Sequence, residues 1–132
     1  MNQYVQPAGW MAPKGYSNGM SARGRIVTVA GQVGWDPRTC KIGMKDFAHQ
    51  ASQALDNVLV VLKTAGASPG HVTRMNWYIT DREAYLEAQK EVGIAYRARF
   101  GSHYPAMTLV VVAGLLEEGA LVEIEATAVI PD

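Results

Sequence analysis

The last quarter of the chain constrains its fold most strongly. Two runs rich in β-branched residues, 105–113 and 121–130, flank a stretch of glycine, leucine and glutamate at 114–120. Such runs are typical of strands, and a glycine-bearing stretch between two of them is typical of a hairpin loop. The pattern predicts two antiparallel strands joined by a loop.

The second run alternates in character. Successive side chains on a strand point to opposite faces, so one set is expected to pack on a core. The other set places Glu123 and Glu125 on one face, about 7 Å apart along the strand. If this face is shielded from water, the two carboxylates are candidates for chemistry; on an open face they are solvated acids. The core-facing set is Val122, Ile124, Ala126, Ala128 and Ile130.

The preceding part of the chain predicts a strand, a helix, a second strand and a second helix. Residues 25–30 and 72–79 are rich in β-branched or aromatic residues, whereas residues 46–65 and 82–100 repeat apolar residues at three- and four-residue spacing. With the two final strands, this order predicts a single α+β domain over residues 1–132. Its mixed sheet would be covered on one face by two helices.

Short signals mark the ends of both helices. Asp46 is predicted to cap the first helix, and Gly66 to end it. Thr80 and Glu83 have the spacing of a capping box at the start of the second.

The sheet face away from the helices is expected to be apolar. An apolar face of this kind usually marks a subunit interface, which predicts oligomerisation without fixing its order. The residues assigned to this face are Met107, Leu109, Val111, Leu121 and Val129.

Composition excludes several classes of function. Lysine plus arginine and aspartate plus glutamate each number 12, for a net charge of zero. No stretch is strongly basic, which argues against nucleic acid as the main partner, because phosphate binding needs a patch of positive charge. A single cysteine, Cys40, excludes an internal disulfide and fits a cytoplasmic location. The N-terminal residues lack the pattern of a signal peptide, and the apolar runs are too short to span a membrane.

No motif for a metal or a nucleotide cofactor is present. The sequence has no glycine-rich phosphate loop, no Cys-x-x-Cys and no Gly-x-Ser-x-Gly. Its three histidines, His49, His71 and His103, lack the spacing of metal ligands. We therefore expect neither a metal nor a cofactor.

A few single residues are candidates for a site. Tyr16 either lines a site or fills a gap in the core. Gly31 permits close approach of another backbone or a ligand. In the middle of a helix, glycine lowers helix stability by about 1 kcal/mol relative to alanine. Gly93 therefore indicates close packing or space left for another group. The nearby Arg97 and Arg99 are expected to be solvated.

Several short stretches form a further pattern when taken together. They are Ala-Gly-Gln at 30–32, Asp-Pro at 36–37, residues 53–58, Ala-Gly at 65–66, Tyr-Ile-Thr-Asp at 78–81, Tyr-Pro-Ala at 104–106 and Val-Glu-Ile-Glu-Ala at 122–126. In these stretches and in its element order, the chain resembles the RidA family of reactive intermediate deaminases, also called the YjgF family. The resemblance implies a chorismate-mutase-like α+β fold. It also implies a homotrimer with ligand clefts between subunits.

The resemblance further implies an activity. The best-understood members hydrolyse imines and enamines, such as 2-aminoacrylate, to a keto acid and ammonia without a cofactor. Their pocket holds a carboxylate-binding arginine, a glutamate that activates water, a tyrosine, a serine and an asparagine. By this resemblance the tyrosine is Tyr16 and the glutamate is Glu123, and both Gly31 and Tyr104 join the expected substrate-binding set.

The remaining pocket positions depart from the family pattern. The serine position is Ala30, the asparagine position is Gly93, and a frequent reactive cysteine is Leu109. The arginine position is Met107, whose thioether cannot form the charge-assisted pair that a carboxylate needs. A wider and more apolar cleft is expected. The candidates for a substitute cation are Arg23, Arg25 and His103.

Three functions remain open at this point. One is a RidA-type hydrolase with altered specificity, in which Glu123 acts as a general base. Another is a non-catalytic module that binds a small ligand in the same cleft. A ribonuclease activity, attributed to some members of the family, fits least well with the neutral charge.

Overall fold

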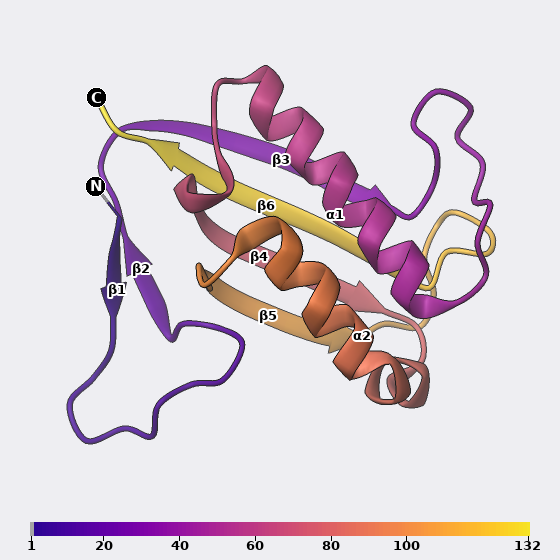
Figure 1. Ribbon diagram of the computed structural model, residues 1–132, viewed down its shortest axis with the longest axis horizontal. Coiled ribbons are helices and arrows are strands. Elements are labelled where there is room, and N and C mark those ends of the chain that lie inside the picture. Colours follow the sequence, from indigo (N-terminus) through magenta and orange to yellow (C-terminus); the bar gives the residue numbers. More distant parts are fainter. Residues whose placement is uncertain (1) are drawn as a thin grey trace.

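The computed structural model describes residues 2–132 and has the element order predicted from the sequence. Figure 1 shows both long helices on the same side of the main sheet, which confirms the α+β class. The elements are β1 (Gln3–Val5), β2 (Gly19–Ser21), β3 (Arg25–Val33), α1 (Phe47–Thr64), the short 3₁₀ helix η1 (Pro69–His71), β4 (Val72–Ile79), α2 (Arg82–Phe100), β5 (Ala106–Val111) and β6 (Val122–Ile130).

Four strands form the main sheet in the order β3-β6-β4-β5, and β1 pairs with β2 in a separate two-stranded ribbon. Strand β6 runs antiparallel to both β3 and β4, whereas β4 and β5 are parallel. The sheet is therefore mixed, as predicted.

The predicted pairing of the last two strands is wrong, because β4 lies between them. Trp77 of β4 pairs with Leu109 on one side and with Ile124 on the other. Strand β4 also carries the fully buried Met75 and Ile79. In this central place its backbone groups are paired on both sides, whereas a β5–β6 hairpin would leave β4 with an open edge. The connection over residues 112–121 is long enough to cross the intervening strand.

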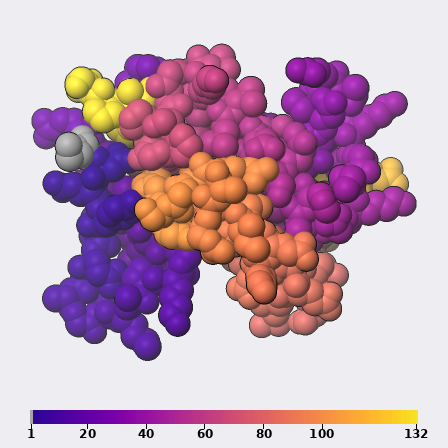
Figure 2. Space-filling view, viewed as in Figure 1, coloured from indigo at the N-terminus to yellow at the C-terminus, as the bar shows by residue number. Residues whose placement is uncertain are grey.

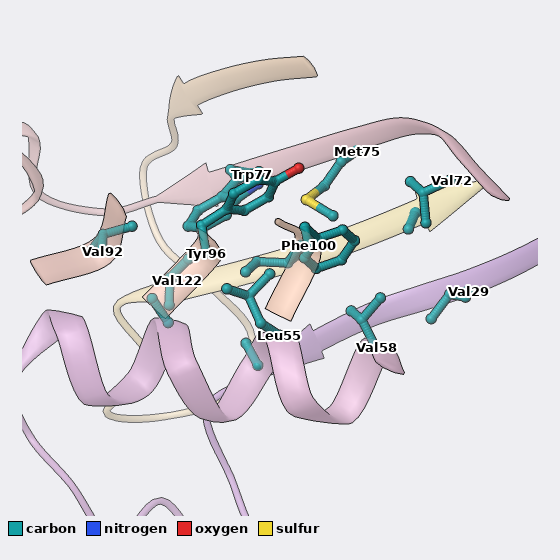
Figure 3. Packing of buried hydrophobic residues seen from close by; sticks show 14 of the residues in the cluster. Val29, Leu55, Val58, Val72, Met75, Trp77, Val92, Tyr96, Phe100 and Val122 are labelled. Atoms are coloured by element: carbon teal, nitrogen blue, oxygen red, sulfur yellow. The ribbon is translucent and has the colours of Figure 1, made fainter. Parts of the chain in front are cut away.

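The two helices bury the apolar side of the sheet. In β6, Val122, Ile124 and Ala128 are 0% exposed, so the alternation in the sequence predicted the core side correctly. Figure 3 shows Leu55 and Val58 of α1 packed among the buried side chains of the sheet. Val92, Tyr96 and Phe100 of α2 belong to this core, and Met107 of β5 packs against it.

The ends of α1 are those predicted. The Asp46 carboxylate accepts a hydrogen bond from the His49 N–H at 3.3 Å, and Gly66 follows the helix with φ +84°. The expectation that Arg99 is solvated is wrong. Its guanidinium pairs with Asp56 of α1 at 2.6 Å and joins the two helices.

Helix α2 is capped one residue later than predicted. The Asp81 carboxylate accepts hydrogen bonds from the N–H groups of Glu83 and Ala84 at 3.0 and 3.1 Å. Thr80 still belongs to the sheet region, because its N–H donates to the Leu121 carbonyl. The N-cap is therefore Asp81, whose backbone is extended, as is usual at this position.

The prediction of an apolar second sheet face is wrong for its three residues on β5. Val129 does lie on the face away from the helices, opposite Ile26 of β3. Met107 pairs with Met75, which is buried beneath the helices, so Met107 lies on the helix side of the sheet. Leu109 and Val111 share that side, because strand residues two apart point the same way. They lie at the β5 edge, partly beyond the cover of α2.

The face away from the helices also carries a polar cluster centred on Glu125. The Tyr78 hydroxyl and the Asn76 amide both donate hydrogen bonds to this carboxylate, the latter at 3.2 Å. The bond to Glu125 is the main cause that raises the pKa of the Tyr78 phenol. Within residues 2–132, no helix combines the length and the apolar character needed to cross a bilayer.

Candidate functional site

A cleft of about 410 Å³ opens between α2, the β5 edge and residues 14–16. In Figure 2 a notch separates the indigo N-terminal segment from the orange and salmon segment that contains α2. The residues that line the cleft are Lys14, Gly15, Tyr16, Trp77, Tyr85, Gln89, Val92, Gly93, Tyr96, Arg97, Tyr104, Met107 and Leu109.

Aromatic and aliphatic side chains form most of the cleft wall. Tyr96 stacks between Phe100 and Tyr104, with ring centroids 4.8 and 5.1 Å away. The Tyr96 hydroxyl donates to the His103 carbonyl at 2.6 Å, and burial raises the pKa of this phenol. Tyr96 is therefore a fixed, neutral wall residue and not an acid or a base. Such a wall favours an apolar part of a ligand.

Tyr16 reaches the cleft because the neighbouring residue is attached to the start of β5. The Ser17 N–H donates to the Pro105 carbonyl at 3.0 Å, and the Ser17 hydroxyl donates to the Tyr104 carbonyl. A parallel bridge between Ser17 and Ala106 continues this pairing. Tyr16 is 42% exposed and lines the cleft, so it does not fill a gap in the core.

The polar groups of the cleft are few. The indole N–H of Trp77 has no hydrogen-bond partner within residues 2–132, although the residue is only 4% exposed. Lys14 and Arg97 contribute positive charge from two separate segments, and Gln89 adds an amide. The cleft wall contains no aspartate or glutamate among the described residues.

A second group of predicted site residues lies elsewhere, on β3 and β6. The pairing of these strands is irregular between Val29 and Gln32, and this bulge contains Ala30 and Gly31. A Cβ atom on Gly31 would lie 2.0 Å from Oε2 of Glu123. Glycine is therefore needed at this position for the Glu123 carboxylate to lie against the backbone.

Within one chain, the predicted site residues thus fall into two groups. Tyr16, Gly93, Tyr104 and Met107 line the cleft. Ala30, Gly31 and Glu123 do not line it.

The substitute cations named from the sequence do not line the cleft. His103 is bonded to the Tyr4 hydroxyl and the Val72 carbonyl, and Arg25 is bonded to the Ala65 carbonyl. Arg97 was missed because an exposed arginine near a helix end is usually solvated. Its signal in the sequence is the spacing from Gly93, since residues four apart share a helix face.

No three histidine, cysteine, aspartate or glutamate side chains within residues 2–132 come together in the way that metal ligands do. The cleft itself offers tyrosine, lysine, arginine and a thioether. This set is suited to holding an organic molecule with an anionic group.

The fold and the cleft define a class of small α+β proteins with a ligand cleft beside the second helix. A family profile described as Endoribonuclease L-PSP matches residues 9–130, and the chain therefore belongs to this family, the RidA/YjgF family. The resemblance inferred from the short motifs is confirmed.

Individual relatives are similar over most of their length. A RutC family protein of Pyrococcus horikoshii is 33% identical over 86% of this chain and 85% of its own. The 2-iminobutanoate/2-iminopropanoate deaminase of Escherichia coli is 32% identical over 80% of each chain. Among solved structures, a Rid family protein of unknown function from Yersinia pestis has a TM-score of 0.84 and 30% identity over 98% of each chain.

Proposed function

We propose that the chain is a cofactor-independent hydrolase that deaminates a reactive imine or enamine. Water adds to the carbon of the C=N bond while the nitrogen gains a proton. The C–N bond then breaks, ammonia leaves and a C=O bond forms; an enamine is first protonated on carbon to give the imine. The deaminase name of relatives that are similar over most of the chain supports this reaction.

One observation carries the proposal more than any other. The cleft combines Tyr104, from a stretch that matches the family, and Tyr16, the tyrosine that the resemblance assigns, with a wall that is mostly aromatic and aliphatic. An imine is hydrolysed by a single positioned water, and a cleft that holds the substrate in one orientation suits such a step.

Glu123 is the proposed general base. Its carboxylate would accept a proton from the attacking water and later return it to the leaving nitrogen. Because Glu123 does not line the cleft of its own chain, we propose that the cleft of one copy meets Glu123 of another in a homotrimer. Among the described residues the cleft lining contains no carboxylate, and Glu123 of another copy would supply one.

Met107 is proposed to alter the specificity. A thioether at this position gives a small substrate carboxylate no charge-assisted partner, but packs well against a larger apolar group. We therefore expect weak activity on the imine derived from 2-aminoacrylate. Imines with longer or aromatic side chains are expected to be better substrates.

The test is hydrolysis of imines formed in the cuvette by an L-amino acid oxidase. Leucine, methionine and phenylalanine supply bulky imines, and alanine supplies the small one. Semicarbazide traps whatever imine remains. For the bulky imines, the wild-type protein is expected to lower the amount of semicarbazone formed and to speed release of the keto acid. Glu123→Gln is expected to change neither. If no imine is hydrolysed faster with protein than without it, the hydrolase proposal is wrong.

The alternative is a binding module without turnover. It is favoured by three departures from the family pocket, Ala30, Gly93 and Met107. Saturable binding of a small organic molecule in the cleft, combined with no hydrolysis of any imine, would favour this alternative.

A further inference from the structure

The guanidinium of Arg97 lies directly over Gly93. A Cβ atom at position 93 would be 3.2 Å from one terminal nitrogen of Arg97 and 3.8 Å from its central carbon. Side chains on a helix lean toward its N-terminus and cover the preceding turn, which explains this contact four residues back. The glycine thus leaves the guanidinium a place against the helix backbone, inside the cleft lining.

Within the described part of the chain, Arg97 forms no ion pair. The ion pairs among residues 2–132 join His49 with Asp46, Arg82 with Glu83 and Arg99 with Asp56, so Arg97 takes part in none of them. Lys14 adds a second cation to the cleft lining. Two unpaired cations and no acid make the cleft a place where an anion is favoured.

We propose that Arg97, assisted by Lys14, is the anion anchor of the cleft, and that its ligand is a carboxylate with a bulky apolar group. The carboxylate lies toward α2, and the apolar group lies toward Met107, Leu109 and Trp77. The carboxylate of the ligand is therefore bound by a residue of α2. Met107 of β5 supplies an apolar packing surface at the position where the family pattern has an arginine. The inference rests on the proposed function for the use of the cleft, but its test requires no turnover.

Two further features fit this arrangement. The unpartnered indole N–H of Trp77 is a buried donor in the same cleft wall, and such a donor is costly unless a ligand or water accepts from it. Glycine is a poor helix residue, and its presence at position 93 is explained if a larger side chain would move the guanidinium. Gly93 is in this sense a positioning residue for Arg97.

The experiment measures binding by calorimetry with two probes, phenylpyruvate and its methyl ester. The pair differs in the negative charge and not in the aromatic ring. Five proteins are compared: wild type, Arg97→Gln, Arg97→Lys, Gly93→Asn and the control Arg82→Gln. Arg82 lies on the same helix, outside the cleft lining, and pairs with Glu83.

Wild type and Arg82→Gln are expected to bind phenylpyruvate more tightly than the ester. Arg97→Gln is expected to weaken phenylpyruvate binding about ten- to a hundredfold, the usual loss for one charge-assisted hydrogen bond, without affecting the ester. Arg97→Lys retains the charge and is expected to keep part of the affinity. Gly93→Asn, which places a side chain beneath the guanidinium, is expected to act in the same direction as Arg97→Gln.

Two results would overturn the anchor. One is unchanged phenylpyruvate binding in Arg97→Gln. The other is a wild type that binds the ester as tightly as the acid, or that binds neither. A charge-dependent loss of binding without hydrolysis of any imine would support the anchor while removing the hydrolase, so the two proposals fail separately.

Discussion

Met107 and Glu123 lie on opposite faces of the sheet, because Met107 pairs with Met75 of β4 and Glu123 pairs with Tyr78. Residues 75 and 78 are an odd number of positions apart on one strand, so their side chains point to opposite sides. A substrate held beside Met107 cannot reach Glu123 of the same chain through the sheet. The proposed reaction therefore depends on a second copy of the chain.

The first prediction concerns the two acids of β6. Glu123→Gln keeps the shape but removes the proton acceptor, so turnover of a bulky imine is expected to fall about 10²- to 10⁴-fold. Glu125 accepts hydrogen bonds from Tyr78 and Asn76, and Glu125→Gln replaces this charged acceptor with a neutral one. The substitution is expected to lower the free energy of unfolding by about 1 kcal/mol and to leave turnover nearly intact. Initial rates and urea unfolding measure both effects. Equal turnover for wild type and Glu123→Gln would remove Glu123 as the base.

The second prediction concerns the space that Gly31 leaves. Gly31→Ala places a Cβ atom where the Glu123 carboxylate now lies, and the acid must move. Turnover is expected to fall nearly as far as in Glu123→Gln. Gly43→Ala is the matched control, because a Cβ at Gly43 meets nothing within 4 Å. Normal turnover in Gly31→Ala would show that the position of Glu123 is not critical.

The sequence predicted local structure well and long-range pairing poorly. The alternation of β6 and the three- and four-residue spacing over residues 82–100 identified the buried faces, because burial repeats with the period of each element. The place of β4 between β5 and β6 was missed, since strand order depends on contacts far apart in the sequence. The role open to Arg97 was missed for a similar reason: it depends on which segments meet across the cleft.

The third prediction concerns alkaline pH. The hydrogen bond to Glu125 raises the pKa of Tyr78 above its unfolded value, so the protonated phenol stabilises the fold. This stabilisation is fully present below about pH 10 and is lost as the pH rises through the raised pKa. Tyr78→Phe is expected to lower the urea midpoint at neutral pH and to make the decline above pH 10 shallower. An identical alkaline decline in wild type and Tyr78→Phe would contradict this.

The fourth prediction concerns position 107. Met107→Arg is expected to raise kcat/KM for the small imine derived from alanine by less than about tenfold, below the full gain of a charge-assisted pair. Ala30 and Gly93 still differ from the family pocket, and the new cation enters a cleft that already contains Arg97. Activity on the phenylalanine-derived imine is expected to fall, because the apolar surface is lost. A gain on both imines would show that Met107 does not determine specificity.

The assembly itself is tested by light scattering. We expect a mass of three chains at micromolar concentration, whereas a monomer would separate the cleft from Glu123 altogether. Mass alone does not show that two copies build one site.

The most direct measurement is turnover by mixed oligomers of two inactive variants, Glu123→Gln and Tyr16→Ala. The two variants are mixed in equal amounts and refolded together. If the cleft of one copy uses Glu123 of another, about a quarter of the sites then combine an intact cleft from one variant with an intact Glu123 from the other. We predict that the mixture regains about that share of wild-type turnover. Turnover that stays at the mean of the two separate variants would contradict a site built from two copies.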